Sequence, residues 1–224
     1  MISREQLAKM IDHSLLNPSV TEADVMKACR EALQYGFAAV VVNPGHVSIV
    51  ARELKGSAVK VCSVISFPFG LTPTAVKVYE ARMVLEEGAE EIDMVMNYSA
   101  LRSGQTELVL NDIKGVVEEA GKIQRKVVVK VILENCYLTD NEKRKACRLV
   151  VQAGADYVKT STGFGKGGAT VEDIRLMREV VGPRFGVKAA GGIRTVEEAL
   201  QMIEAGANRI GASASISILE SLKS

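Results

Sequence analysis

Four charged side chains interrupt segments that are otherwise apolar and rich in β-forming residues. Asp93 lies in EIDMVMN, Lys130 in VVVKVILEN, Lys159 in YVKTSTGFGKGGAT and Lys188 in FGVKAAGGIR. One such lysine alone is typical of a solvated strand end, but a buried ammonium is costly unless it is paired or used. The four together therefore indicate either a buried ion pair, between Asp93 and Lys130 or Lys188, or a site that needs an amine.

A glycine-rich loop follows the segment that holds Lys159. Its sequence GFGKGG, residues 163–168, matches the dinucleotide pattern G-x-G-x-x-G. That pattern requires an acidic residue at the end of the next strand to bind the ribose, and this strand offers Lys188 instead. A P-loop is also excluded, because Gly167 stands where Ser or Thr should follow Lys166.

Two further glycine-containing loops follow the last two expected strands. AAGGIRT contains Gly191, Gly192 and Arg194, and GAS spans residues 211–213. Barrels of alternating strands and helices often bind phosphate at these loops through backbone N–H groups. We therefore predict a phosphate site there. The alternative is that the loops are ordinary tight turns, with Arg194 exposed beside a helix start.

One unit of structure repeats along the chain. QYGFAAVVV, EEGAEEIDMVM, QAGADYVKT and EAGANRIGA each join a polar helical tail, a glycine and an apolar run. Their glycines suit the left-handed position just past a helix: Gly36, Gly88, Gly154 and Gly206. Threonines with Asp or Glu three residues later predict helix starts: Thr21, Thr139, Thr170 and Thr195.

The strand-like runs number eight, with amphipathic helical patterns between most of them. Their expected ranges are 10–13, 37–42, 59–65, 90–96, 127–133, 155–160, 185–190 and 208–212. Regular alternation of apolar strands and helices predicts a parallel sheet covered by helices. We expect an α/β protein with a single (β/α)8 TIM barrel over residues 1–224, preceded by a short N-terminal helix. The four charged residues would then point into the barrel mouth.

Composition narrows the classes of function. The chain has 224 residues, of which 47% are apolar and 25% charged, with a net charge of +1. This near-neutral balance argues against a nucleic-acid binder. The longest apolar run, at residues 37–42, is far too short for a membrane span, and the first residues carry no signal-peptide pattern. Two histidines are too few for a histidine-rich metal cluster.

The cysteines are scattered and form no C-x-x-C pair. We expect them to be small buried side chains in a reducing cytosol rather than disulfide partners or zinc ligands. They are Cys29, Cys62, Cys136 and Cys147.

The chain resembles the deoxyribose-phosphate aldolase family along nearly its whole length. The matching segments, in family order, are IDHSLLNP, VVVNP, VISFPFG, EIDMVMN, KVILEN, VKTSTGFG, VKAAGGIRT and RIGAS. The resemblance implies a cytoplasmic, metal-independent class I aldolase without a cofactor, acting as a homodimer. It implies reversible cleavage of 2-deoxy-D-ribose 5-phosphate to acetaldehyde and D-glyceraldehyde 3-phosphate.

The resemblance also assigns roles to residues. Lys159 would form the Schiff base, Lys188 would be the neighbouring cation, and Asp93 would relay protons. The substrate phosphate would be held by the glycine loops with Arg194 and Ser213: Gly163, Gly191, Gly192, Arg194, Gly211 and Ser213.

Schiff-base formation requires Lys159 to be neutral. An ordinary lysine is only about 0.04% neutral at pH 7, so lowering its pKa to near 7 requires about 4.6 kcal/mol. A second ammonium about 5 Å away, at an effective dielectric constant of about 20, supplies roughly 3.3 kcal/mol. We therefore expect Lys188 to be the main cause of the lowered pKa, with burial supplying the rest.

The sequence departs from its relatives at three places. Val41 stands where many relatives have cysteine, which we expect to remove a thiol that aldehydes attack. Ala214 replaces a second serine, which we expect to weaken phosphate binding slightly. Some relatives end in a tyrosine that reaches the site, whereas this chain ends LESLKS.

Three other functions stay open at this point. One is a Schiff-base aldolase with a keto acid or ketose phosphate as substrate, and another is a catalytically silent barrel that binds a sugar phosphate. The third is an isomerase that uses Glu134, at the end of the fifth expected strand, as its base.

Overall fold

The computed structural model describes residues 2–222. Within them, parallel strands form one closed barrel in the order β1 to β8, and β1 pairs with both β2 and β8. The strands are β1 Ile11–Leu15, β2 Ala39–Val42, β3 Lys60–Ile65, β4 Glu91–Val95, β5 Val128–Ile132, β6 Tyr157–Lys159, β7 Gly186–Ala190 and β8 Arg209–Ala212. The predicted (β/α)8 barrel is therefore confirmed.

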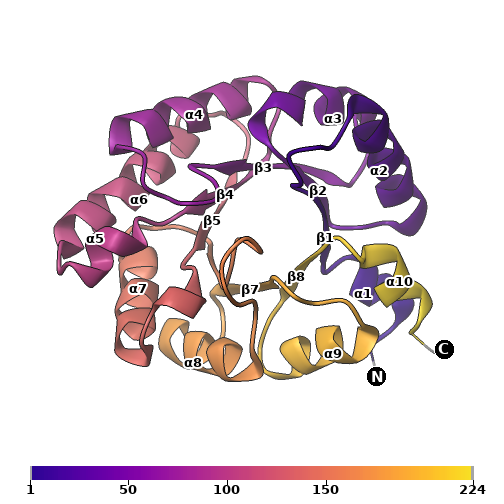
Figure 1. Ribbon diagram of the computed structural model, residues 1–224. Coiled ribbons are helices and arrows are strands. Elements are labelled where there is room, and N and C mark those ends of the chain that lie inside the picture. The colour runs from indigo at the N-terminus through magenta and orange to yellow at the C-terminus, as the bar shows by residue number, and fades with distance from the viewer. Residues whose placement is uncertain (1, 223–224) are drawn as a thin grey trace.

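Helices surround the barrel, as Figure 1 shows. They are α1 Arg4–Ala8, α2 Glu22–Tyr35, α3 Val47–Glu53, α4 Thr74–Glu86, α5 Tyr98–Arg102, α6 Thr106–Gly121, α7 Asp140–Gln152, α8 Val171–Val181, α9 Val196–Glu204 and α10 Ser215–Glu220. Short 3₁₀ turns lie at Pro44–His46 and Asn135–Tyr137. The predicted short N-terminal helix is α1, which contacts α10.

The helix starts form as predicted. Thr21, Thr139 and Thr195 each accept a hydrogen bond from the backbone of the acidic residue three positions later, whose side chain bonds back to the threonine. Thr170 accepts the same bond from Asp173, but the Asp173 carboxylate pairs instead with Lys143 at 2.7 Å. Each cap satisfies backbone N–H groups that the first turn of a helix leaves unpaired.

The helix ends explain why several strands start later than the sequence indicates. Gly36 has φ 71°, and the next residue, Phe37, donates its N–H back to Ala32 O at 3.1 Å. The same closure joins Ala155, the first residue of the expected strand 155–160, to Val150 O at 3.4 Å. Because these apolar residues still close the preceding helix, they cannot begin the strand.

The main apolar core lies between the barrel and its helices. A small second cluster fills part of the barrel interior with Ala39, Val41, Cys62 and Val64. Burial of the cysteines is confirmed for Cys29, Cys62 and Cys147, but it is wrong for Cys136, which is half-buried. None of the helices in residues 2–222 is long and apolar enough to cross a membrane.

Gly186 shows how closely neighbouring strands are packed. A Cβ atom at this position would lie 2.3 Å from the ring of Tyr157, the register partner of Gly186 on β6. The Tyr157 ring in turn lies 5.8 Å from the Arg209 guanidinium. Only a residue without a side chain leaves room for this ring.

We therefore predict that Gly186→Ala lowers the free energy of unfolding by about 1–3 kcal/mol, the usual cost of overpacking a core. Gly121→Ala is the matched control, because a Cβ atom there would have no neighbour within 4 Å. Urea unfolding followed by circular dichroism measures both variants. Equal stability of Gly186→Ala and the unaltered protein would contradict the packing argument.

Candidate active site

A cavity of about 530 Å³ opens at the carboxyl ends of the strands. Lys159 lines it, together with all of the residues predicted to bind phosphate: Gly163, Gly191, Gly192, Arg194, Gly211 and Ser213. The lining also includes residues of β1, of the segment after it and of α2, among them His13, Asn17 and Glu31. The topology thus brings the predicted amine and the predicted phosphate loops to one cavity, as expected for a barrel of this kind.

Lys159 is the last residue of β6. Its side chain is only 3% exposed, and its Nζ donates a hydrogen bond of 2.7 Å to Asp93 Oδ2. Asp93 and Lys188 are fully buried below it and do not line the cavity. Of these three groups, Lys159 is therefore the one that a molecule in the cavity reaches.

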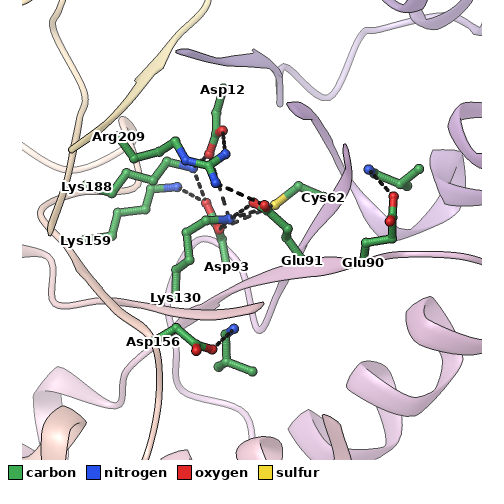
Figure 2. Close-up of polar contacts among 12 residues, drawn as sticks. Asp12, Cys62, Glu90, Glu91, Asp93, Lys130, Asp156, Lys159, Lys188 and Arg209 are labelled. Carbon is green, nitrogen blue, oxygen red and sulfur yellow. Dashed lines mark hydrogen bonds and ion pairs between the residues drawn. The ribbon is translucent and has the colours of Figure 1, made fainter. Parts of the chain in front are cut away.

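Asp93 joins three lysines rather than one. Its Oδ2 accepts hydrogen bonds of 2.7 Å from both Lys159 and Lys188, and its Oδ1 accepts one of 2.8 Å from Lys130. Figure 2 shows the three lysines pointing toward this carboxylate. The simple ion pairs with Lys130 and Lys188 both exist, but they are parts of a larger cluster that includes Lys159.

The pKa of Lys159 lies below that of an ordinary lysine. Burial is the largest cause, Lys188 lowers the pKa further, and Asp93 opposes both. The expectation that Lys188 would dominate is therefore wrong. Two carboxylates, those of Asp12 and Asp93, partly cancel the charge of Lys188, and burial of the Lys159 ammonium costs more than the remaining repulsion.

The other two lysines keep their protons. Burial alone would lower the pKa values of Lys130 and Lys188, but nearby carboxylates raise both above the ordinary value. Burial alone would likewise raise the pKa of Asp93, yet Lys130, Lys159 and Lys188 hold it well below its usual range. At this site the pKa shifts favour the charged forms of Lys130, Lys188 and Asp93, whereas burial favours the neutral form of the Lys159 amine.

The phosphate loops have the backbone conformation that glycine permits. Gly191 and Gly192 have φ values of 87° and 82°, in the left-handed region. The Arg194 side chain is exposed at the cavity, and its backbone N–H donates to Glu198 Oε2 at 2.7 Å. Arg194 therefore stands beside a helix start, as the alternative proposed, while its guanidinium is free to reach an anion in the cavity.

Gly211 also lies against the Lys188 side chain, which the sequence did not indicate. A Cβ atom at this position would lie 3.0 Å from Lys188 Cε, so the glycine makes room for the lysine stem.

The hydroxyl groups after Lys159 bond mainly within the protein. Thr160 Oγ1 donates to Ala190 O at 2.9 Å and accepts from Ala190 N at 3.0 Å, which ties the residue after β6 to the last residue of β7. Glu134 accepts hydrogen bonds from the backbone and hydroxyl of Thr162. Glu134 is absent from the cavity lining, so its position gives no support to an isomerase base.

Three further charged residues of the site were missed from the sequence. Arg209 Nη1 donates to Asp12 Oδ1 at 2.6 Å, and Arg209 Nη2 donates to Glu91 Oε1 at 3.1 Å. A signal was present, since Glu91 precedes Asp93 by two positions, a spacing that places both side chains on one face of a strand. The same alternation places Arg209 inward with Gly211.

Comparisons with known proteins agree with this geometry. A sequence model of the DeoC/LacD aldolase family matches residues 6–220. The deoxyribose-phosphate aldolase of Thermococcus gammatolerans is 60% identical over 96% of this chain and 95% of that protein. That of Carboxydothermus hydrogenoformans is 56% identical over 100% of this chain and 98% of that protein.

A solved structure is similar over almost the whole fold. It is a tetrameric deoxyribose-phosphate aldolase from Aeropyrum pernix, with 39% identity and a TM-score of 0.91. The match covers 99% of this chain and 92% of that one.

Proposed function

Because the chain belongs to the DeoC/LacD family of aldolases, we propose that it reversibly cleaves 2-deoxy-D-ribose 5-phosphate to acetaldehyde and D-glyceraldehyde 3-phosphate. The observation that carries this proposal is the buried Lys159 amine, with a lowered pKa, at the floor of a cavity whose rim holds the glycine loops and Arg194. The high identity to relatives with this name favours acetaldehyde over keto acids as the donor.

The reaction begins when the neutral Lys159 amine attacks the aldehyde carbon of the open-chain sugar, and loss of water gives a protonated imine. Removal of the proton from the 3-hydroxyl then breaks the bond between carbons 2 and 3. The electron pair of the bond between carbons 2 and 3 moves into the imine and gives an enamine. Carbons 3 to 5 depart as the phosphorylated aldehyde. Protonation of carbon 2 and hydrolysis release acetaldehyde and restore Lys159. The imine is the electron sink, so this chemistry requires no metal.

Asp93 and Lys188 are placed to move protons beside the imine. The Asp93 carboxylate touches both Nζ atoms at 2.7 Å, so a proton has a continuous hydrogen-bonded path between Lys159 and Lys188. The hydroxyl and carbon atoms of the substrate would be reached directly or through water. General acid–base assistance of this kind is typically worth about 10²–10⁴ in rate.

The substrate phosphate would bind at the rim of the cavity. We assign it to the backbone of Gly163, Gly191, Gly192 and Gly211, with Ser213 and Arg194. A phosphate at this place would hold carbon 1 over Lys159 and supply the binding energy that orients the reacting bond.

The remaining features of the proposal concern the whole chain. Residues 1–224 would form one domain, since the barrel closes over residues 11–212. The enzyme would work in the cytoplasm, where a reducing environment keeps the free cysteines as thiols.

We also propose that the chain forms a homodimer through α4. A groove of about 860 Å³ lies between the β3–α4 loop and α4, and its apolar lining is exposed. Phe69 is 65% exposed and Tyr79 61% exposed; the other exposed large apolar side chains of this surface are Leu71, Val76 and Met83. A surface with both a groove and projecting aromatic side chains can pair with a second copy of itself about a twofold axis. The tetrameric relative from Aeropyrum pernix supports assembly.

We predict that reduction with borohydride in the presence of acetaldehyde attaches an ethyl group to Lys159. Burial lowers the pKa of Lys159 from 10.5, so the labelling rate should reach half its maximum below that pH. Lys159→Leu should lose both labelling and turnover. Lys166→Leu, which removes an exposed lysine of the same loop, is the control and should retain both. Peptide mapping by mass spectrometry decides the matter, and a label on another lysine would refute the mechanism.

For Arg194→Ala, we predict a KM for the phosphorylated sugar that is higher by about tenfold or more, the usual worth of a charged hydrogen bond. Cleavage of unphosphorylated 2-deoxyribose should change little. Arg175→Ala removes another exposed arginine, on α8, and serves as the control. An equal loss with both sugars would exclude Arg194 from phosphate binding.

For the homodimer, we predict that Tyr79→Glu produces monomers in analytical ultracentrifugation with an unchanged circular dichroism spectrum. Val151→Glu places the same charge at an exposed apolar position on α7 and should remain dimeric. A monomeric unaltered protein, or a dimeric Tyr79→Glu, would refute this interface.

A further inference from the structure

Seven charged side chains from six strands meet inside the barrel, and we name them the barrel ion cluster. They are Asp12, Glu91, Asp93, Lys130, Lys159, Lys188 and Arg209. Figure 2 shows them converging on Asp93 and Asp12. Each is nearly or fully buried, the Arg209 side chain being the most exposed at 13%. A buried charge is tolerated only with a compensating partner, so the balance of this cluster matters.

The cluster contains three carboxylates and four cationic side chains. If all were ionised, one positive charge would be in excess inside the barrel. The excess is removed when one lysine loses its proton. The contacts of the cluster identify which lysine that is.

Lys159 has the fewest ionic partners of the four cations. Lys130 lies 2.5 Å from Glu91 Oε2, 2.8 Å from Asp93 Oδ1 and 3.8 Å from Asp12 Oδ2. Lys188 pairs with Asp12 and Asp93, and Arg209 pairs with Asp12 and Glu91. Among the described residues, Lys159 has one carboxylate partner, Asp93. Deprotonation of Lys159 therefore breaks fewer ion pairs than deprotonation of any other cation in the cluster.

We propose that Arg209 and Glu91 are positioning residues that set the proton occupancy of Lys159 through the charge balance of the barrel ion cluster. Arg209, Lys130 and Lys188 together carry three positive charges, which balance the three carboxylates of Asp12, Glu91 and Asp93. The cluster is then neutral only when Lys159 carries no proton. This inference rests on the proposed imine chemistry of Lys159. It adds two residues that contact neither Lys159 nor the cavity.

Other groups that face the cluster do not alter this balance. The Cys62 thiol lies 3.4 Å from Asp93 Oδ1 and 3.5 Å from Lys130 Nζ, and burial raises its pKa, so it stays neutral. The Tyr157 ring lies beside Arg209. Glu134 is bonded to Thr162 rather than to a cluster member, burial raises its pKa, and it is unchanged in every variant below. His13, next to Asp12, bonds to Ser215 and Glu31.

The pH dependence of borohydride trapping with acetaldehyde tests the proposal. In Arg209→Met, three carboxylates face Lys130 and Lys188 alone, so Lys159 keeps its proton to balance the third. The acid limb of the trapping rate is the pH range over which the rate rises as Lys159 loses its proton. It should therefore move to higher pH by about one unit, the usual effect of one nearby charge. At a pH below this limb, trapping should be about tenfold slower. Arg209→Lys retains the charge and should leave the limb in place.

Glu91→Gln should act in the opposite direction. With one carboxylate fewer, the cluster holds an excess positive charge even when Lys159 is neutral, so the acid limb should move to lower pH. The double variant Arg209→Met/Glu91→Gln restores the balance and should return the limb to its original position. Two variants that merely damaged packing would not cancel in this way.

Several outcomes would overturn the inference. One is slower trapping in Arg209→Met with no shift of the acid limb, and another is an equal shift in Arg209→Lys. If circular dichroism shows that Arg209→Met does not fold, the shifts of Glu91→Gln and of the double variant decide. If the unaltered protein is not labelled by acetaldehyde and borohydride, the proposed function is refuted. The premise of this inference, imine formation by Lys159, then fails with it. If Lys159 is labelled but the acid limb lies at the same pH in the unaltered protein and in the variants, only the role of Arg209 and Glu91 is refuted.

Discussion

The Asp93 carboxylate is the contact on which the site depends. It is fully buried and accepts hydrogen bonds from Lys130, Lys159 and Lys188, which come from three successive strands. A buried carboxylate of this kind is ionised only because cations surround it, and the cations are tolerated only because it is ionised. Each partner therefore fixes the position and protonation of the others. Lys159 is the member of this assembly that lines the cavity, and its bond to Asp93 holds it in place, which suits the proposed attack on a carbonyl carbon at short range.

The closed barrel makes this assembly possible. Asp12 on β1 and Arg209 on β8 are far apart in the sequence, yet pairing of β1 with β8 brings them into contact at 2.6 Å. An open sheet would place these two strands at opposite edges. Closure also buries these side chains, and in a buried environment of low dielectric constant each charge influences the others strongly. The same closure makes any unbalanced charge in the interior unfavourable. In the inference above, the excess positive charge is removed when Lys159 loses its proton.

The sequence was sufficient to predict the fold and the grouping of Lys159, Lys188 and Asp93, because both leave local signals. Repeated helix caps and glycines mark the units, and Lys159, Lys188 and Asp93 are conspicuous in apolar strands. Arg209 and Glu91 lie in equally short strands, but the sequence shows no distances across the barrel, so their partnership was not evident. The cause of the lowered Lys159 pKa was misjudged for the same reason, since Asp12 was not recognised as a partner of Lys188. The apolar surface of α4 was also missed, because this helix is apolar on two faces: Ala81, Val84 and Leu85 face the core, while Val76, Tyr79 and Met83 face outward.

The interior of the barrel is divided between an ionic part and an apolar part. Ala39, Val41, Cys62 and Val64 fill the apolar part, and Cys62 touches both Asp93 and Lys130. The expectation that Val41 removes a thiol stays a prediction, and a different thiol, that of Cys62, lies beside the site. Aldehydes react with thiolates rather than thiols, and burial together with the charge of Asp93 raises the Cys62 pKa. The amine and the thiol are thus driven in the same direction by burial, toward their neutral forms. For an amine the neutral form is the nucleophile, and for a thiol it is the inert form, so in the proposed mechanism the same burial would favour a reactive Lys159 and an unreactive Cys62.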